Sequence, residues 1–205
     1  MSNNVTRVLV AVVAIPAALG IVWYGGLLLA ALVVALAVLG TRELFDLAER
    51  TGVRPLRGLG MVFAALPALA TWMLGTTGST DLSGVPLWLL SQWPLAASMA
   101  PVVVLMGVLW WRAPDQKPLA AAAVTLVGPL YCGLLPSALL VIRYGAGPDQ
   151  SWAATWLVFF PLAITWLCDS FAMWGGKIFR GPKLAPVVSP GKTRSGALSG
   201  LLGGG

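Results

Sequence analysis

An acidic residue in an otherwise apolar stretch is the strongest candidate for chemistry in this sequence. Asp169 follows the run ITWLC and precedes SFAMWGG, and Lys177, Arg180 and Lys183 come soon after it. A carboxylate at the centre of a membrane helix costs about 2.5–3.5 kcal/mol, so it normally faces a partner, a bundle interior or a water-filled cavity. The alternative is an Asp–Lys pair that only aids packing. We favour a functional role for Asp169.

A second candidate is residues 184–196, which read LAPVVSPGKTRSG. The GKT triplet is similar to the end of a nucleotide-binding P-loop, GxxxxGK[ST], which joins a strand to a helix. However, Pro186 stands where the P-loop has its first glycine, and no strand is expected before the triplet. Pro182, Pro186 and Pro190 favour an extended loop instead. The pattern therefore argues against a P-loop.

What remains is a cationic loop that could bind an anion. Its candidate side chains are Lys183, Ser189, Lys192, Thr193 and Arg194. The residues from Gly196 onward can begin a new helix. Cationic groups, hydroxyls and a helix N-terminus together suit a phosphate. A positively charged loop that holds anionic lipid headgroups loosely explains the same residues equally well.

The elements that must position these residues are predicted to be membrane helices. Of the 205 residues, 58% are hydrophobic and 10% are charged, whereas soluble domains carry about 25% charged residues. Five runs contain no Asp, Glu, Lys or Arg: 8–41, 58–80, 82–111, 119–142 and 150–168. A membrane helix needs roughly 20 mainly apolar residues, and these runs do not alternate as membrane strands do. The sequence predicts an all-α, polytopic transmembrane helical bundle.

We expect about six complete spans and the start of a seventh, in a single integral membrane domain over residues 1–205. The spans are placed at about 7–23, 27–45, 59–77, 91–111, 119–141 and 153–175, and the seventh begins near 196. Run 8–41 would make one helix of about 50 Å, so the Gly25-Gly26 pair is expected to turn between two helices. Residues 1–150 supply the N-terminal helices, and 151–205 begin the catalytic part.

The positive charges predict which ends of the spans face the cytoplasm. With six crossings before residue 176, all but one of the 13 Lys and Arg residues fall on one side, and the exception is Arg143. Cytoplasmic loops carry the Lys and Arg excess. The N-terminus and residues 176–195 are therefore expected in the cytoplasm, in a multi-pass protein of the cell membrane. The net charge of +6 needs no nucleic acid as a partner.

The other titratable residues give weaker leads. Four carboxylates are expected to be solvated in loops: Glu49, Asp81, Asp115 and Asp149. Two more, at the end of the second span, are expected to pair with arginines beside them: Glu43 and Asp46, with Arg42 and Arg50. The chain has no histidine, which removes the commonest general base. Cys132 and Cys168 are interpreted as small core residues, which argues against a structural zinc site.

The segment from Cys168 to Gly196 resembles the CDP-diacylglycerol synthases, also called phosphatidate cytidylyltransferases. CDSFAMWGGKIFRGPKLAPVVSPGKTRSG is similar to the family segment DTGAYFxGRxFGKxKLAPxxSPKKTxEG. Asp169 falls on the family's Asp, and the runs K-L-A-P, S-P and K-T match as they stand. A weaker similarity extends upstream through the Gly-Gly turn, Glu43 and the run YCGLLPSALLVIR.

This resemblance implies that CTP and phosphatidic acid are converted to CDP-diacylglycerol and diphosphate, with Mg²⁺ or another divalent cation. It implies that Asp169 binds the metal and that Asp169 and Lys192 are catalytic. The residues it assigns to substrate phosphates are Lys177, Lys183, Ser189, Thr193 and Arg194. Such a reaction needs two anions brought together and their charge neutralised, rather than a histidine base. The implied partners are CTP, phosphatidic acid and membrane lipids, and small-residue helices would permit a homodimer.

Some features depart from the family pattern. Phe171 replaces a Gly, Gly191 replaces a Lys, and Ser195 replaces a Glu. The family's later signature, S-x-x-K-R-x-x-K-D followed by H-G-G-x-x-D-R-x-D, would lie beyond residue 205. We therefore expect a truncated member that lacks the family's principal metal-binding carboxylates, and its activity alone is an open question.

Two other functions stay open at this point. A transporter could place an intramembrane Asp beside a broken helix near the midplane, although no inverted repeat is visible in the sequence. A CTP-dependent polyprenol or phytol kinase would share the cationic loop. The products formed from labelled CTP distinguish these alternatives from the synthase.

Overall fold

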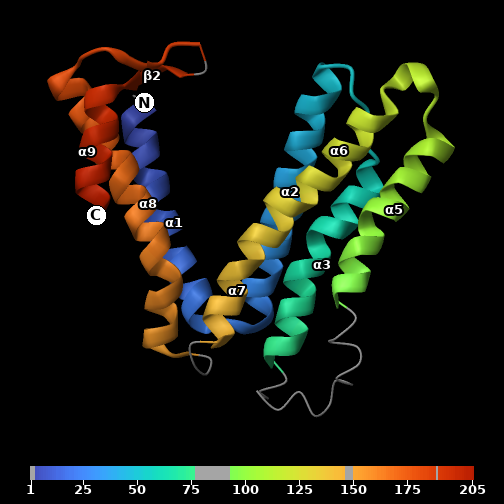
Figure 1. The fold of residues 1–205 in the computed structure, drawn as a ribbon. Coiled ribbons are helices and arrows are strands. Elements are labelled where there is room, and N and C mark those ends of the chain that lie inside the picture. Colours follow the sequence, from blue (N-terminus) through green and yellow to red (C-terminus); the bar gives the residue numbers. More distant parts are fainter. Residues whose placement is uncertain (1–2, 77–92, 146–149, 188) are drawn as a thin grey trace. The chain divides into compact units, whose positions relative to one another are not determined.

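The computed structural model describes residues 3–76, 93–145, 150–187 and 189–205. The chain divides into two compact units, Met1–Ala154 and Thr155–Gly205, and each is described by itself. The first unit holds most of the helices. The second contains the greater part of one long helix, a β-hairpin and a last helix (Figure 1). Of the carboxylates expected in loops, Asp81 and Asp149 lie outside the described residues.

Within the described residues, each predicted span coincides with helical structure. The helices are α1 (Asn3–Tyr24), α2 (Gly26–Arg50), α3 (Arg57–Thr76), α5 (Trp93–Trp111), α6 (Pro118–Pro129), the π-helical turn η3 (Leu130–Leu134), α7 (Leu135–Gly145), α8 (Trp152–Phe179) and α9 (Arg194–Gly204), with a short 3₁₀ turn, η2, at Pro114–Gln116. Among the described residues, three helices are long and apolar enough to cross a membrane: Gly26–Arg50, Pro118–Gly145 and Trp152–Phe179. The helical class is confirmed, and these helices indicate a membrane protein. The number of six crossings stays a prediction.

The outward side chains of α8 support the membrane interpretation. Many of them are large and apolar, and the most exposed are Trp152, Trp156, Leu157, Phe160, Trp174, Ile178 and Phe179. A water-soluble protein rarely exposes so large a contiguous apolar surface. In a bilayer the same side chains lie in hydrocarbon, and the helix satisfies its own backbone hydrogen bonds.

One short segment departs from the predicted helical class. Strand β1 (Lys183–Ala185) pairs with strand β2 (Ser189–Thr193) in an antiparallel two-stranded ribbon, with Lys183 opposite Thr193 and Ala185 opposite Ser189. The expectation that no strand leads into the GKT triplet is wrong, because β2 contains the triplet and runs directly into α9 (Figure 1). A two-stranded ribbon has only edge strands, and edge strands tolerate a proline such as Pro190.

The turn between the first two helices lies where the two glycines predicted it. Gly25 and Gly26 have φ values of 69° and 54°, which glycine adopts without a steric penalty. Arg143 closes this turn from α7: its Nε donates to the carbonyl of Val22 at 2.8 Å and a second guanidinium nitrogen donates to that of Trp23 at 3.1 Å. Cations stabilise the exposed carbonyls at the C-terminus of a helix. Arg143, the one cation expected on the opposite side of the membrane, is therefore buried and hydrogen-bonded to the C-terminal end of α1.

One buried aromatic ring joins three helices of the first unit. Phe45 of α2 is fully buried. A Cβ atom added to Gly60 of α3 would lie 2.4 Å from the Phe45 ring, and one added to Gly128 of α6 would lie 2.8 Å from it. The two glycines make room for the ring, which joins three helices.

Ion pairs at the end of α2 differ from the expected ones. Asp46 pairs with Arg57 at the start of α3, and Glu49 accepts a hydrogen bond of 2.8 Å from the same guanidinium. Glu49 was expected to be solvated in a loop, but it lies in α2, which runs on to Arg50. The short connection from Thr51 to Leu56 brings Arg57 back to these carboxylates, a tertiary effect that neighbouring charges in sequence do not reveal.

Candidate active site

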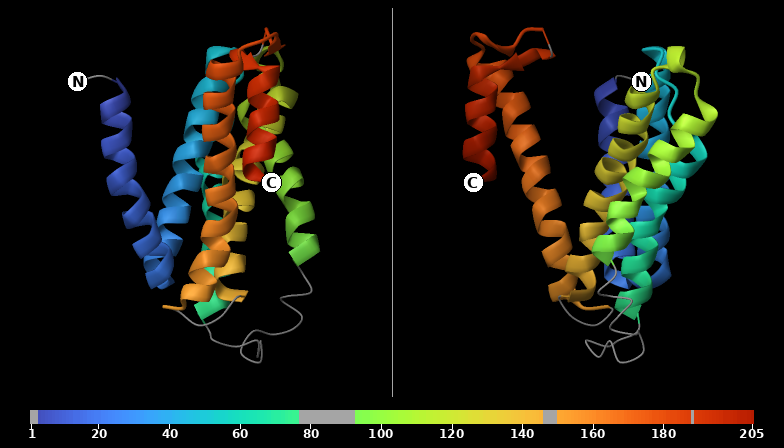
Figure 2. Two further views of the ribbon diagram at one scale, coloured as in Figure 1. Left: turned by 90° about the vertical axis from the view of Figure 1, so that its left-hand side faces the viewer. Right: turned by 45° about the vertical axis from the view of Figure 1, so that its right-hand side comes forward.

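The second unit is a helical hairpin with unusually close backbones. Figures 1 and 2 show α9 running back along α8. Small residues spaced by four face each other: Cys168, Ala172 and Gly176 on α8, and Gly196, Gly200 and Gly204 on α9. A Cβ atom on Gly196 would lie 2.6 Å from the carbonyl oxygen of Ala172, and one on Gly200 would lie 2.9 Å from that of Cys168. Membrane helices use such small residues for close approach.

Hydrogen bonds close the β-hairpin against the start of α9. The side chain of Thr193 caps α9 by accepting from the backbone N–H of Gly196 at 3.1 Å. The hydroxyl of Ser195 donates to the carbonyl of Arg180 and lies 3.1 Å from the Thr193 hydroxyl. The backbone N–H of Arg194 donates to the carbonyl of Pro182 at 3.0 Å. Arg180 and Pro182, in the segment that follows α8, are thus hydrogen-bonded to the first turn of α9.

These elements enclose a pocket of about 720 Å³ within the second unit. One wall is a single face of α8, because its lining residues follow a helical spacing: Asp169, Ala172, Met173, Gly176 and Lys177. The other lining residues come from the segment that follows α8, from the hairpin and from α9: Arg180, Gly181, Lys183, Leu184, Gly191, Lys192, Thr193, Gly196 and Ala197. Residues three and four apart lie on one side of a helix, so the spacing carries Asp169 and Lys177 to the same surface, whereas Lys183 and Lys192 reach the pocket from the two strands of the hairpin.

The pocket is strongly cationic. Its lining includes four cations, Lys177, Arg180, Lys183 and Lys192, but Asp169 is the one carboxylate among its lining residues. The ammonium of Lys177 also lies 5.4 Å from the centre of the Trp174 ring, within the range of a cation–π contact. Such a set of side chains can bind several phosphate oxygens at once.

Asp169 lies well inside α8 rather than at its end. It lies ten positions before Phe179, the last residue of the helix, which corresponds to about 15 Å along the axis. The cations lie nearer the end of α8 and on the hairpin that follows it. The pocket therefore runs from a cationic end to a carboxylate set among apolar residues.

The pocket brings together most of the residues predicted from sequence. It is lined by Asp169, Lys177, Lys183, Lys192 and Thr193, but Ser189 and Arg194 are not among its lining residues. Ser189 lies at the far end of the ribbon opposite Ala185, and Arg194 is exposed at the start of α9. The side chains of these two residues thus lie outside the pocket that the other five share.

Arg180 is a lining residue that the sequence reasoning did not select. It has a φ of 50°, a left-handed conformation that is uncommon for residues other than glycine. This conformation turns the chain out of α8 and leaves the Arg180 carbonyl where Ser195 reaches it. Its position in the sequence between Lys177 and Lys183, next to Gly181, was the signal that could have identified it as a lining residue.

Thr193 also has a structural role that the sequence did not predict. A serine hydroxyl has one hydrogen, and Ser195 uses its hydrogen on the Arg180 carbonyl. The hydrogen between the two hydroxyls therefore belongs to Thr193, whose oxygen accepts from Gly196. Thr193 thus holds the hairpin to α9, and its contact with a substrate phosphate stays a prediction.

The donor set fits a metal ion that is shared with a nucleotide. Among the residues that the structure describes, no group of three or more His, Cys, Asp and Glu side chains could hold a metal ion. Mg²⁺ in phosphoryl-transfer sites usually takes one or two carboxylates and completes its shell with substrate phosphates and water. Asp169 alone meets the protein's side of that requirement, in a pocket whose cations would hold the phosphates.

Comparisons with known proteins agree with this chemistry. The profile of the cytidylyltransferase family matches residues 5–204. A protein of Rickettsia felis named phosphatidate cytidylyltransferase is 54% identical over 50 residues, which cover 24% of this chain and 22% of that relative. A protein of the same name from Brucella abortus is 28% identical over 204 residues, which cover 98% of this chain and 64% of that relative. The chain thus spans less than two thirds of the Brucella relative, and no solved structure gives a significant match.

Proposed function

Because the chain belongs to the cytidylyltransferase family, we propose that it acts as a phosphatidate cytidylyltransferase of phospholipid biosynthesis. The substrates are CTP and phosphatidic acid, and the products are CDP-diacylglycerol and diphosphate. The observation that carries this proposal is the pocket in which one face of α8 and the following hairpin gather one carboxylate and four cations. The relatives named phosphatidate cytidylyltransferase support the choice of substrates.

In this reaction an oxygen of the phosphatidate phosphate attacks the α-phosphorus of CTP. The bond from that phosphorus to the oxygen bridging to the β-phosphate breaks, and diphosphate leaves. The protein's task is to bring two anions together and to neutralise the charge that develops. Lys177, Arg180, Lys183 and Lys192 would hold the phosphates in the pocket. Arg194 and Ser189 would contact a phosphate only at the margin of this pocket.

Asp169 would hold the divalent metal, Mg²⁺ in the simplest case. When bound, such an ion supplies charge neutralisation and orientation to the phosphates. Asp169 would then position the nucleotide from the apolar end of the pocket, while the lysines would hold it from the cationic end. Lys192, next to the capped start of α9, is the cation we assign to the reacting phosphates.

The membrane arrangement is part of the proposal. Six crossings before residue 176 would place the N-terminus and residues 176–195 in the cytoplasm, where CTP is found. The lipid headgroup lies at the membrane–water interface, so the cationic end of the pocket and the phosphatidate phosphate would lie at the same depth. The Lys and Arg excess of that side supports this topology.

A double-label assay tests the reaction. Membranes containing the complete gene product receive phosphatidic acid and CTP labelled either at the α-phosphate or at the γ-phosphate. A cytidylyltransferase moves the α-label into lipid and releases the γ-label as diphosphate. A CTP-dependent lipid kinase would instead move the γ-label into lipid and release CDP, and a transporter would give neither product; either outcome would overturn the proposal.

A further inference from the structure

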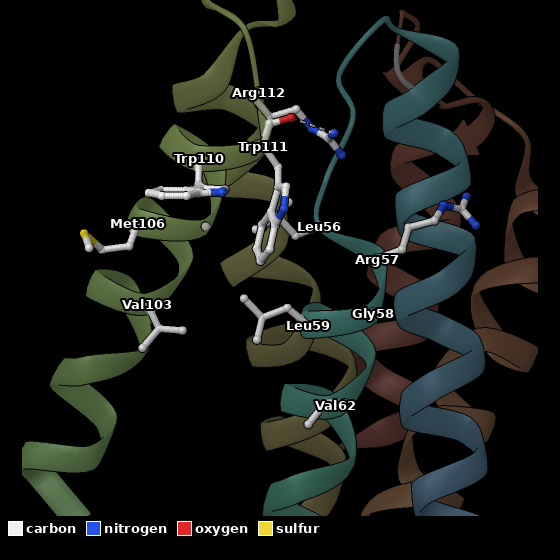
Figure 3. Close-up of a pocket in the computed structure, with 11 residues that line it drawn as sticks. Leu56, Arg57, Gly58, Leu59, Val62, Val103, Met106, Trp110, Trp111 and Arg112 are labelled. Carbon is white, nitrogen blue, oxygen red and sulfur yellow. Dashed lines mark hydrogen bonds between the residues drawn. The ribbon is translucent and has the colours of Figure 1, made fainter.

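A groove between α3 and α5, distinct from the Asp169 pocket, has the form of a lipid site. It has a volume of about 890 Å³ and lies wholly within the first unit. Its lining is apolar along both helices: Leu59 and Val62 come from α3, and Val103, Met106 and Trp110 come from α5 (Figure 3). Along α5 the groove extends from Trp111 to Val103, or roughly 12 Å at the rise of an α-helix.

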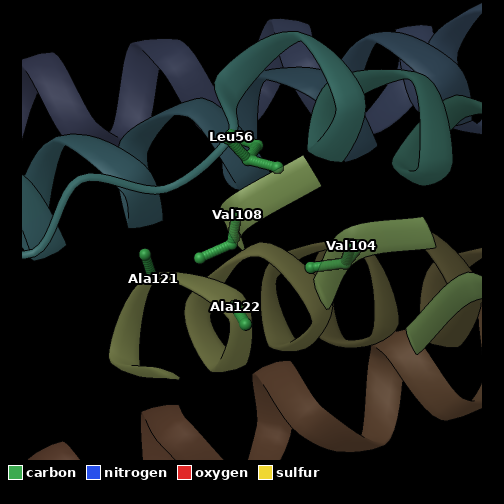
Figure 4. Packing of buried hydrophobic residues seen from close by; sticks show 5 residues of the cluster. All are labelled: Leu56, Val104, Val108, Ala121 and Ala122. Atoms are coloured by element: carbon green, nitrogen blue, oxygen red, sulfur yellow. The ribbon is translucent and has the colours of Figure 1, made fainter. Parts of the chain in front are cut away.

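The floor of this groove is well packed. Leu56, Val104, Val108, Ala121 and Ala122 form a buried cluster beneath it, and the first three are exposed by 8% or less (Figure 4). Gly107 belongs to the lining, and a Cβ atom there would lie 2.9 Å from Leu56 and 3.2 Å from the Trp111 ring. The glycine therefore lets Trp111 lie against the floor. The groove therefore lies against closely packed, buried residues.

One end of the groove is cationic. Arg112 follows the last residue of α5, and its guanidinium donates to the carbonyls of Arg54 at 3.0 Å and Pro55 at 3.2 Å. These bonds fix the side chain but bring no negative charge, and among the described residues no ion pair includes Arg112. An adjoining pocket shares Arg57 and Arg112 with the groove and adds Arg54 and Glu49.

We propose that this groove binds a phospholipid with an anionic headgroup. The headgroup phosphate contacts Arg112 and Arg54, and one acyl chain lies along α5 between Trp110 and Val103. Arg57 is already paired with Asp46 and Glu49, so the uncompensated charge is that of the other two arginines. Paired tryptophans at the cationic end suit the headgroup level, where amphipathic rings gather. A zwitterionic lipid would bring its own cation to a site that needs an anion.

Lipid retention in detergent tests this proposal without any reference to catalysis. The purified complete gene product is incubated with phosphatidylglycerol or phosphatidylcholine, and bound lipid is counted by native mass spectrometry. We expect one phosphatidylglycerol to be retained in preference to phosphatidylcholine. Arg54→Gln should weaken retention of phosphatidylglycerol about fivefold, whereas the matched change Arg42→Gln, at an exposed arginine of α2, should not.

The apolar part of the site is tested by filling it. Gly58 lines the groove, and a Cβ atom there would meet nothing within 4 Å, so Gly58→Phe should fold and occupy the acyl position. We expect retention to fall at least roughly tenfold, because losing the burial of two methylene groups already has that effect. Gly20 of α1 has the same open surroundings, and Gly20→Phe is the control.

Three results would overturn the proposal. Phosphatidylcholine could be retained as well as phosphatidylglycerol, or Gly58→Phe could retain lipid as Gly20→Phe does. Gly58→Phe could also leave lipid retention unchanged while shifting the protein from dimer to monomer, in which case a second copy of the chain covers the groove. Because the groove and the Asp169 pocket belong to different units, failure here leaves the proposed reaction standing, and the converse also holds.

Discussion

Thr193 links the sequence motif to the geometry of the pocket. Its hydroxyl caps α9 and joins Ser195, which in turn holds the Arg180 carbonyl. Thr193 and Ser195 together therefore join β2, the start of α9 and the residue that follows α8. Lys192 and Arg180, which both line the pocket, lie next to this closure.

Replacing Thr193 by the isosteric Val should release the first turn of α9. Loss of an N-cap costs about 1 kcal/mol, so hydrogen exchange of the amides in that turn should accelerate about fivefold through local opening. Thr193→Ser keeps the hydroxyl and serves as the control. Equal exchange in the Val and Ser variants would show that the cap does not hold this turn.

At the residue scale, sequence reasoning found the charged groups but not how they are held. Asp169, Lys177, Lys183 and Lys192 were selected from their residue types and spacing, and the structure places them on one pocket. Ser195 was noted only as a departure from a family pattern. Its bond to the carbonyl of Arg180, 15 positions earlier, depends on a tertiary closure that residue types do not encode.

At the scale of elements, the contact between α8 and α9 supports the pocket. The glycines Gly196, Gly200 and Gly204 recur every four residues and meet small residues of α8. Without a hydrophobic driving force between helices in lipid, close backbone packing is a main source of stability. The hairpin rests on this contact, since β2 leads directly into α9.

Gly200→Ala should destabilise the protein even though alanine favours helices. Helix propensity alone predicts a gain of about 1 kcal/mol for Gly→Ala. At Gly200 the new Cβ would lie 2.9 Å from the Cys168 carbonyl oxygen, and overpacking of this kind costs about 1–3 kcal/mol. Gly20→Ala, in a helix with open space around it, should stabilise. Thermal unfolding in detergent should give midpoint shifts of opposite sign, and shifts of the same sign would contradict this packing.

Apolar runs predicted the helices well because membrane helices need long uncharged segments. The helices over Gly26–Arg50 and Trp152–Phe179 follow directly from such runs. Strands β1 and β2 escaped prediction because they span three and five residues, contain a proline and show no alternating pattern. Their pairing depends on Thr193 and Lys183 being brought opposite each other, which neither segment specifies alone.

At the scale of the whole molecule, the long apolar helices indicate a membrane protein, and the predicted topology gathers the Lys and Arg residues on one side. The groove between α3 and α5 could not be foreseen from sequence, because it depends on which helices pack together. Leu56, Val104 and Ala121 lie far apart in the chain and meet in one cluster. The topology and a homodimer stay predictions.

Cysteine labelling tests the topology. Val187 is 96% exposed in the hairpin, and Gln150 is exposed before α8. After replacement of Cys132 and Cys168 by Ala, a membrane-impermeant maleimide should label Gln150→Cys in intact cells and Val187→Cys only after permeabilisation. The reverse pattern would place the hairpin outside, away from CTP.

The central claim is that the Asp169 pocket is where the cytidylyl group is transferred. It is tested most directly by CTP-dependent formation of CDP-diacylglycerol in two matched variants of the complete gene product, Asp169→Asn and Asp115→Asn. Asp115 is an exposed carboxylate of the short turn Pro114–Gln116 in the first unit. We predict that Asp169→Asn nearly abolishes the product, a loss of at least roughly a hundredfold, whereas Asp115→Asn retains the wild-type rate. Wild-type activity in the Asp169→Asn variant would contradict the account.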